Sequence, residues 1–411
     1  MDCGCDALKT PLLAFDDALA KLLATATAVA EQQTIKVQDA LGRVLAADVV
    51  SNFNIPPYAN SAMDGYACNH QDLNDFNQLE VVTTSLAGHP SKQVLSTGQC
   101  ARIMTGAMMP KGADTVIMQE QVNRDGEYIS LQAQVKAGAN VRVQGEDIAA
   151  GNVVLSKGHV IQARDIGLLC AIGVPKVSVL RQLKVALIST GDELVEPGNA
   201  LKEGQIFDSN RQLVMAMLAP MGVDIRDFGI IADQREAIAN AITQATEWAD
   251  VLITSGGVSV GDADYVKEIL SELGDINFWK LAIKPGKPFA FGQVGKCAFL
   301  GLPGNPVSAA ITFDRLGIPF IKLRQGHQIM GEIAIKAIAQ ADFKKRPGRT
   351  EFQRGIATQT ADGQWYVESA GLQGSGILSA LSRANCHVIL PAESDGVLAS
   401  QQVEIIHYKY L

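Results

Sequence analysis

Several short segments of the chain combine glycine with acidic, basic or hydroxyl side chains, and these residues could do chemistry. The first is segment 189–193, whose sequence STGDE places Asp192 and Glu193 side by side after an apolar run. Carboxylate oxygens in such a position can coordinate a hard cation such as Mg²⁺. A turn that carries two solvated acids is the plainer interpretation, and the segment alone leaves both open.

A second segment, residues 254–264 with the sequence TSGGVSVGDAD, has the composition of an anion site. Its glycines allow backbone N–H groups to approach a phosphate closely, and a helix pattern follows it. Asp262 or Asp264 could then cap that helix or hold Mg²⁺ beside the phosphate. Neither a Walker loop nor a dinucleotide-binding fingerprint is present. A phosphate site and a plain glycine-rich turn therefore both remain open.

The same segment contains a G-x-S-x-G pattern at residues 257–261, the signature of the serine hydrolase nucleophile elbow. In a true elbow the chain turns from strand to helix at the serine itself. Here glycines separate the strand from Ser259, and the helix pattern begins several residues later. These differences disfavour a serine hydrolase.

Basic residues gather around a Pro-Gly turn in an otherwise acidic chain. Residues 280–288 read KLAIKPGKP, which brings Lys280, Lys284 and Lys287 together in a chain of formal net charge −8. Surface lysines are usually solvated, yet these flank apolar residues at the end of a predicted strand. A local trap for an anion is therefore the favoured interpretation. Further on, Asn305 and Pro306 predict a helix start that is either purely structural or aimed at an anion.

These segments follow the strands of an alternating pattern that begins at Lys184. Apolar runs typical of buried strands alternate with helix patterns; the strand runs are KVALIST, VDIRDFGII, DVLITSGG and INFWKLAI. This rhythm predicts a doubly wound α/β domain with a mostly parallel sheet covered on both faces. Ligands of such sheets bind outside the carboxyl ends of the strands, so the reactive segments are expected to meet at one edge.

The regions on either side of this domain have a different pattern. Short runs rich in β-branched residues and glycine extend to about Gly145, and short strands return after about His327. The predicted organisation is therefore multidomain α/β plus β. Its parts are an N-terminal helical and mixed dimerisation or linking domain (1–50 and 146–180), a small β-rich domain (51–145), the α/β domain (181–326) and a C-terminal β-barrel-like domain (327–411).

Composition excludes several classes of protein. An excess of acidic over basic residues, 43 against 35, argues against a nucleic-acid partner. The start MDCGCDALKT lacks the features of a signal peptide, and no apolar run approaches the length of a membrane span. The 7 scattered cysteines are typical of reduced thiols in the cytoplasm. Cys3 and Cys5 could grip a soft metal, but a mobile tail is the favoured interpretation.

Taken together, the motifs of this chain resemble those of the MoeA family, which includes the C-terminal region of gephyrin. They run in the family's order from Asn60 to Gly355, and so many long motifs are far more specific than any one of them. The matching segments are NSAMDGYA, RIMTGA, GEDI, STGDEL, DSN, TSGGVSVGDADY, KLAIKPGKPFAFG, LPGNPVSA and PGRTEFQRG.

The resemblance implies an elongated four-domain chain that works as a homodimer, with its active site between the α/β domain of one subunit and the small β domain of the other. The implied reaction is a transfer: molybdate joins adenylated molybdopterin, the phosphoanhydride breaks, AMP leaves and the dithiolene holds molybdenum. Mg²⁺ would assist. A molybdopterin adenylyltransferase would act upstream, and cofactor-modifying or apo-molybdoenzyme proteins downstream. The alternative is an interaction scaffold of the gephyrin type without turnover.

The resemblance also implies roles for individual residues. Glu193 and Asp264 match metal-binding or water-positioning acids, and Lys280 and Lys284 add catalytic positive charge. The remaining matches bind the substrates or close the site. Lys284, Lys287, Arg349 and Ser375 would hold the oxyanion; Gly256, Gly257 and Ser259 the phosphates; Asp208 and Asp233 the pterin or nucleotide. Pro303 and Pro306 would shape a helix start, and Asp64, Thr105 and Asp147 would close the site from the other subunit.

Overall fold

The structure of the protein is a computed structural model that describes residues 12–256, 265–328 and 331–411. The chain divides into two compact units. The larger unit comprises Met1–Gln33, Gly42–Val44 and Leu180–Leu411, and the smaller unit comprises Thr34–Leu41 and Leu45–Val179. Cys3 and Cys5 lie outside the described residues. The four predicted domain boundaries stay predictions.

A six-stranded sheet forms the centre of the larger unit, in the order β16-β13-β17-β21-β20-β18. Neighbouring pairs among β16, β13, β17 and β21 are parallel, and β20 is antiparallel to both of its neighbours. The predicted mostly parallel sheet is therefore confirmed. The strands are β13 (Lys184–Thr190), β16 (Asp224–Ile231), β17 (Val251–Ser255), β18 (Gly274–Lys280), β20 (Pro288–Val294) and β21 (Cys297–Leu302).

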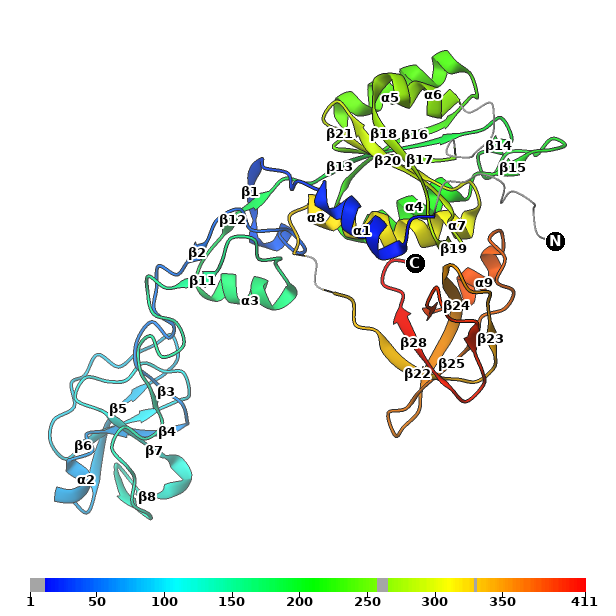
Figure 1. The fold of residues 1–411 in the computed structure, drawn as a ribbon. Coiled ribbons are helices and arrows are strands. Elements are labelled where there is room, and N and C mark those ends of the chain that lie inside the picture. Colours follow the sequence, from blue (N-terminus) through cyan, green and yellow to red (C-terminus); the bar gives the residue numbers. More distant parts are fainter. Residues whose placement is uncertain (1–11, 257–264, 329–330) are drawn as a thin grey trace. The chain divides into compact units, whose positions relative to one another are not determined.

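Helices cover both faces of this sheet, as the alternating pattern predicts (Figure 1). Along β13, Val185 and Leu187 pack into one core, and Ala186 and Ile188 pack into another, because successive strand residues point to opposite faces. Helices α5 (Arg235–Trp248) and α6 (Tyr265–Leu273) supply the second core. The first core includes α1 (Phe15–Ala24), α4 (Asn210–Leu218), α7 (Pro306–Thr312) and α8 (Ile318–Arg324), with a π-helical turn (Phe313–Gly317) between the last two.

Two features of this sheet differ from the sequence prediction. Strands β20 and β21 were not predicted, because short apolar runs separated by a tight turn are not distinguished from other buried segments by periodicity. The run INFWKLAI was predicted as one strand, but β18 ends at Lys280 and Leu281 N donates to Lys287 O at 2.7 Å. Ile283–Lys284 then forms β19, which pairs with a strand of the C-terminal sheet.

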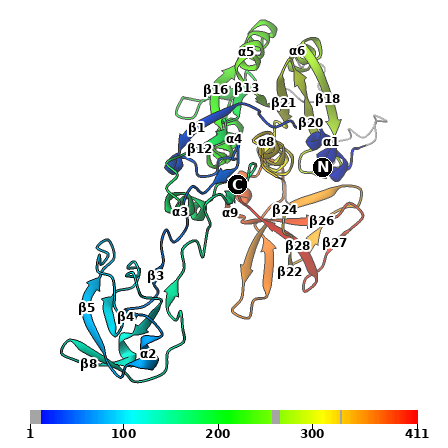
Figure 2. The same ribbon diagram turned by 90° about the vertical axis from the view of Figure 1, so that its left-hand side faces the viewer.

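The C-terminal part of the larger unit is a small closed barrel. Its sheet order is β19-β24-β25-β22-β28-β26, and an additional β24–β26 pairing closes the ring. Figure 2 shows its strands grouped around one core. This confirms the predicted β-barrel-like region. The barrel strands are β22 (Ile335–Ala339), β24 (Thr350–Gln359), β25 (Trp365–Ser369), β26 (Cys386–Leu390) and β28 (Gln402–His407), with helix α9 (Leu378–Arg383) and the short pair β23 (Phe343–Lys344) and β27 (Gly396–Val397) alongside.

The smaller unit contains a second six-stranded sheet, in the order β7-β4-β6-β5-β9-β8. A separate core in this unit packs α3 (Ala163–Ala171) against residues from Val37 to Val179. The sheet strands are β4 (Gly65–Cys68), β5 (Leu79–Ser85), β6 (Gln99–Ile103), β7 (Thr115–Met118), β8 (Val122–Asp125) and β9 (Tyr128–Leu131). Other elements are α2 (Asp72–Asp75), the short strands β2 (Val49–Val50), β3 (Asn60–Ser61), β10 (Val141–Arg142) and β11 (Val153–Leu155), and β1 (Gln32–Lys36) paired with β12 (Lys176–Leu180).

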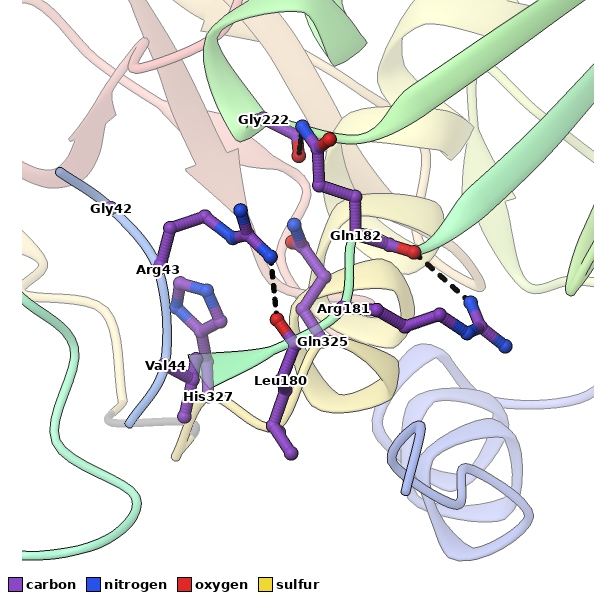
Figure 3. Close-up of a pocket in the computed structure, with 9 residues that line it drawn as sticks. All are labelled: Gly42, Arg43, Val44, Leu180, Arg181, Gln182, Gly222, Gln325 and His327. Atoms are coloured by element: carbon purple, nitrogen blue, oxygen red, sulfur yellow. Dashed lines mark hydrogen bonds between the residues drawn. The ribbon is translucent and has the colours of Figure 1, made fainter. Parts of the chain in front are cut away.

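A small cavity in the larger unit lies where residues 42–44 meet the start of β13 (Figure 3). Its volume of about 10 Å³ has room for at most one water molecule. Three of its polar side chains bond backbone carbonyls: Arg43 donates to Leu180 O at 2.6 Å, Gln182 to Gly222 O at 2.9 Å and Gln325 to Met221 O at 2.7 Å. We conclude that this cavity has a structural role: it is a joint, in the sense that it marks where residues 42–44 pack against residues 180–182.

Asp250 anchors the same joint. Its two oxygens accept from both terminal nitrogens of Arg181 at 2.6 and 2.8 Å, and Lys184 N donates to it at 2.8 Å. Burial alone would raise the pKa of Asp250, but the hydrogen bonds from Arg181 and Lys184 N and the charge of Arg181 outweigh burial and lower it. Such a carboxylate has a lower pKa in the folded protein than in the unfolded chain. It stabilises the fold at pH values above the pKa of the unfolded chain, and this stabilisation is lost as the pH falls through the pKa of the folded protein.

We expect Asp250→Asn to reduce the free energy of unfolding by about 2 kcal/mol at neutral pH, since it removes charged hydrogen bonds from Arg181. Urea denaturation from pH 7 to pH 3 should show that the deficit shrinks below about pH 4. The control Asp275→Asn, at an exposed position of β18, should match wild type throughout. A deficit independent of pH down to pH 3 would contradict this account of Asp250.

Candidate active site

A cavity of about 220 Å³ lies at the carboxyl edge of the central sheet. Its walls come from the ends of β13 and β17, the loop before α7, the start of α4 and the short parallel pair β14 (Leu194–Val195) and β15 (Ile206–Phe207). This is where the strand pattern predicts a ligand. The lining residues are Thr190, Glu193, Leu194, Ile206, Phe207, Asp208, Ser209, Asn210, Ser255, Gly256, Gly304 and Pro306.

Gly256 brings the ends of β13 and β17 close together. Its φ of +93° favours glycine, and a Cβ there would lie 3.1 Å from Thr190 O. Gly256 N also donates to Leu302 O at 3.3 Å, which joins the end of β21 to the same place. The remaining members of the predicted phosphate loop, Gly257 and Ser259, and the predicted metal ligand Asp264 lie outside the described residues.

The acids after β13 take separate positions. Asp192 accepts from Asp233 N at 3.0 Å, and this bond ties the loop after β13 to the loop after β16. Glu193 is exposed and lines the cavity. Its carboxylate folds back over Gly191, since a Cβ built on that glycine would lie 2.4 Å from Glu193 Oε2. Of the two acids, Glu193 therefore lines the cavity, while Asp192 holds the loop.

Asp208 lines the cavity and also belongs to a buried ion cluster. Arg211 is only 2% exposed; its backbone N and Nε donate to the two oxygens of Asp208 at 3.2 and 2.8 Å. The terminal nitrogens of Arg211 contact Asp227 of β16 and Glu196 after β14. Burial opposes the charge of Arg211, but its hydrogen bonds to Asp208 and Asp227 outweigh this and raise its pKa. One guanidinium thus joins α4, β16 and the β14–β15 pair beneath the cavity.

The start of α7 forms another wall. Asn305 and Pro306 occupy the N-cap and first-turn positions predicted for them, but the Asn305 side chain makes no capping bond. Instead, Val307 N donates to Ser375 O at 3.0 Å, which places the loop carrying Ser375 at this helix start. Asn210 supports the wall from α4, since its Nδ2 donates to Gly304 O at 2.8 Å. Pro303 lies buried at the end of β21.

The three lysines predicted to trap an anion lie between the last residue of β18 and the start of β20, and this stretch is called the lysine loop below. Gly286 fits this loop against α7: its φ is +114°, and a Cβ there would lie 2.4 Å from Thr312 Oγ1. Lys284 Nζ lies 3.1 Å from Glu351 Oε1, and Thr350 N donates to Ala282 O at 2.9 Å. The pairing of β19 with β24 therefore places Arg349, the residue just before β24, beside the lysine loop.

Two further predicted residues contact each other in the smaller unit. Asp64 Oδ1 accepts from both Thr105 N and Thr105 Oγ1 at 2.7 Å. The backbone bond from Thr105, followed by the bond from its hydroxyl, lowers the pKa of Asp64. Asp64 is therefore a carboxylate at neutral pH. Asp147 also lies in the smaller unit, where its N donates to Ile55 O at 2.9 Å.

The structure thus brings Glu193, Asp208, Gly256 and Pro306 to one cavity. It brings Lys280, Lys284, Lys287 and Arg349 together at the junction of the central sheet with the barrel, and Asp64 and Thr105 together in the smaller unit. Their catalytic and binding roles stay predictions. Sequence reasoning missed Arg211, Asn210 and Glu351; only the Asp208–Arg211 spacing, three residues apart near a predicted helix, gave a usable signal.

Three family models match successive parts of the chain. They are the MoeA N-terminal region (domain I and II) at residues 13–173, a probable molybdopterin binding domain at 186–323 and the MoeA C-terminal region (domain IV) at 336–408. A protein of Haemophilus influenzae named molybdopterin molybdenumtransferase is 43% identical over 403 residues, which cover 97% of this chain and 100% of the relative. The chain belongs to the MoeA family.

Other members of the MoeA family agree. A molybdopterin molybdenumtransferase of Nostoc sp. is 36% identical over 388 residues, 91% of this chain and 89% of the relative. The crystal structure of a molybdopterin biosynthesis MoeA protein from Pyrococcus horikoshii has a TM-score of 0.83 at 31% identity, over 97% of this chain and 100% of that one. The fold and the family predicted from the motifs are therefore confirmed.

Arg211→Met should reduce the free energy of unfolding by about 3–5 kcal/mol, because it leaves buried Asp208 without its cation. The matched control is Arg235→Met, which removes an ion pair with Glu272 whose side chains are 49% and 59% exposed. The control should unfold at the same urea concentration as wild type. Equal effects of the two substitutions would contradict the role assigned to the buried cluster.

Proposed function

We propose that this enzyme inserts molybdate into adenylated molybdopterin and releases AMP, which makes it a molybdopterin molybdenumtransferase of molybdenum cofactor biosynthesis. The observation that carries this proposal is the full-length match to relatives with that name, together with the cavity at the carboxyl edge of the sheet. The gephyrin-type scaffold without turnover is not favoured, because the relatives that span nearly the whole chain are named as transferases.

The charges at the two sites suit the reaction. Both substrates are anions, so their approach is opposed by repulsion unless fixed positive charge offsets it. Lys280, Lys284 and Lys287 gather on one loop, and the β19–β24 pairing adds Arg349. Glu351 orients Lys284 through the 3.1 Å contact while leaving that lysine side chain 48% exposed. We infer that this basic junction holds molybdate, with Ser375 as a hydroxyl donor, and that the pterin nucleotide occupies the neighbouring cavity.

The polar groups of the cavity suit a nucleotide phosphate. Thr190, Ser209 and Ser255 place hydroxyl groups at the cavity, and a glycine-rich segment, whose backbone N–H groups would suit a phosphate, follows Gly256 in the sequence. Gly257 and Ser259 would continue this phosphate contact, and Asp208 and Asp233 would bind the pterin or the nucleotide. Breaking the phosphoanhydride then releases AMP. A water-excluding, preorganised set of donors stabilises the charge that develops on the phosphate oxygens.

The acids of the cavity fit Mg²⁺. No group of three or more His, Cys, Asp or Glu side chains suited to a metal occurs among residues 12–256, 265–328 and 331–411. Mg²⁺, however, is commonly held by one or two carboxylates together with substrate phosphates. Glu193 offers such a carboxylate. Asp208, which accepts from Arg211, is assigned to the pterin or the nucleotide instead. We propose Glu193 and Asp264 as the Mg²⁺ ligands; when bound, Mg²⁺ would neutralise charge on the phosphate oxygens.

We also propose that the enzyme is a cytoplasmic homodimer whose site is completed by Asp64 and Thr105 of a second subunit. Both lie in the smaller unit, where Asp64 accepts from Thr105 and the Thr105 side chain is exposed. Exposed apolar pairs such as Val50 and Val153, on β2 and β11, give that unit a surface for association. None of the helices in the described part of the chain is long and apolar enough to cross a membrane.

The remaining partners follow from the substrate and the product. A molybdopterin adenylyltransferase would supply the adenylated pterin, and cofactor-modifying or apo-molybdoenzyme proteins would take the product. The formal net charge of −8 supports the absence of a nucleic-acid partner. Free cysteines in the described residues, such as buried Cys68 and Cys100 on adjacent strands, support a reducing compartment.

The proposed function is tested by supplying adenylated molybdopterin, molybdate and Mg²⁺ and measuring AMP release and molybdenum incorporation together. Wild type should couple the two products one to one. Glu193→Gln should lower turnover by about 10²-fold or more, since it removes charge at the phosphate. Glu203→Gln, an exposed position in the connection between β14 and β15, is the matched control and should be unchanged. Wild type that releases no AMP would refute the function.

A mixing experiment tests the shared site. Asp64→Ala and Lys284→Ala should each be inactive as purified homodimers. Co-expressed and randomly paired, they should recover about one quarter of wild-type activity, because half of the dimers carry one intact site of two. A mixture that stays as inactive as the separate variants, while mixed dimers are detected by mass spectrometry, would contradict a site built from two subunits.

A further inference from the structure

An exposed loop of the barrel is held from below by a fully buried arginine. The loop is residues 370–375, between β25 and α9, and Leu372 at its tip is 74% exposed. Arg354, on the neighbouring strand β24, is 0% exposed. Its guanidinium donates to Leu372 O at 2.9 Å and to Gly374 O at 3.1 Å. The charged group thus donates its hydrogen bonds to main-chain carbonyls of the loop.

A buried arginine without an acid is costly. Among the described residues, Arg354 forms no salt bridge, and its Nε has no hydrogen-bond partner. Burial lowers the pKa of Arg354 below its ordinary value, which reflects the cost of desolvating the guanidinium. Carbonyl oxygens offset only part of that cost. Replacing a buried charged group by an apolar side chain of similar volume is often neutral or stabilising, but an apolar residue here would lose the two hydrogen bonds to the loop.

Gln373 fixes the same loop from the opposite direction. Its Oε1 accepts from Arg354 N at 2.8 Å, and its Nε2 donates to Arg354 O at 3.0 Å. Ala370 N also donates to Arg354 O at 3.0 Å. Both the backbone and the side chain of Arg354 therefore bond the loop. The Gln373 side-chain amide bonds the backbone N and O of Arg354, as the backbone of a paired strand would. Arg383 adds two bonds to Ala370 O at 3.0 and 3.2 Å.

The loop ends on Ser375, at the start of α7. Val307 N donates to Ser375 O at 3.0 Å, and Pro306, one residue earlier, lines the cavity. The chain of contacts runs from Arg354 through Gly374 to Ser375 and the cavity wall. Because Gly374 is the residue directly before Ser375, the Arg354–Gly374 bond restrains the backbone from which the Ser375 hydroxyl projects.

We propose that Arg354 is a positioning residue for oxyanion binding: it does not touch molybdate but fixes the loop that presents the Ser375 hydroxyl. This inference rests on the proposed function, which makes Ser375 a donor to the oxyanion. A preorganised donor binds an anion without the entropic cost of ordering an exposed loop. Without Arg354 the loop would order only when molybdate is bound, and affinity for molybdate would fall.

The test is the dependence of AMP release on molybdate concentration. Arg354→Lys keeps the charge, but one ammonium cannot reproduce the planar fork that serves two carbonyls. We expect it to raise KM for molybdate about tenfold, equivalent to about 1.4 kcal/mol, with kcat changed less than about twofold. A merely structural role would reduce the folded fraction, which lowers kcat and leaves KM unchanged. The control is Arg324→Lys, which changes a half-buried arginine that also donates to a carbonyl, Asp250 O, and it should keep wild-type KM.

Another variant, Gln373→Met, tests the inference even if Arg354→Lys folds poorly. Gln373→Met removes the reciprocal amide bonds from the loop side and should raise KM for molybdate in the same direction. In a Ser375→Ala background, Arg354→Lys should raise KM no further, because both changes act through one hydroxyl.

The outcomes separate this inference from the proposed function. If wild type is active, either of two results would overturn the role of Arg354 and leave the transferase function intact. One is an unchanged KM for molybdate in Gln373→Met, and the other is fully additive effects of Arg354→Lys and Ser375→Ala on that KM. A wild type that releases no AMP would overturn the proposed function instead.

Discussion

Parallel strands place their carboxyl ends at one edge of a sheet, and the active-site region of this protein depends on that constraint. The ends of β13, β17 and β21 meet there through short backbone contacts, such as Gly256 N to Leu302 O. Segments far apart in sequence consequently share one cavity. Because β20 runs opposite to its neighbours, the end of β18 also lies at this edge, and the lysine loop starts from it.

Two of the basic side chains near this edge, Arg211 and Lys284, are held by acids from other elements. Arg211 holds Asp208, Asp227 and Glu196 beneath the cavity. Glu351 of the barrel holds Lys284 of the central sheet. Such pairs contribute less to net stability than their Coulomb energy suggests, because desolvation offsets much of it. Their value is geometric: they hold like charges close together before any substrate is present.

The sequence was sufficient for the sheet, its edge and the family, because strand and helix periodicities differ strongly and the motifs are long. It was not sufficient for partners supplied by distant segments. Glu351 lies 67 residues from Lys284, and nothing in the PGRTEFQRG motif indicates which side chain it meets. Asp227 was read only as part of a strand, although it shares Arg211 with Asp208. Strand β19 was merged with β18 because the turn between them is apolar, and only its hydrogen bonds reveal the break.

We propose that two anions bind side by side, the nucleotide in the cavity at the sheet edge and the oxyanion at the basic junction with the barrel. Anomalous diffraction at the molybdenum edge, from crystals grown with molybdate and AMP, tests it most directly. The account predicts a molybdenum peak beside Lys284, Arg349 and Ser375, with the AMP phosphate near Thr190, Ser255 and Gly256. Molybdate bound away from those three side chains would contradict it.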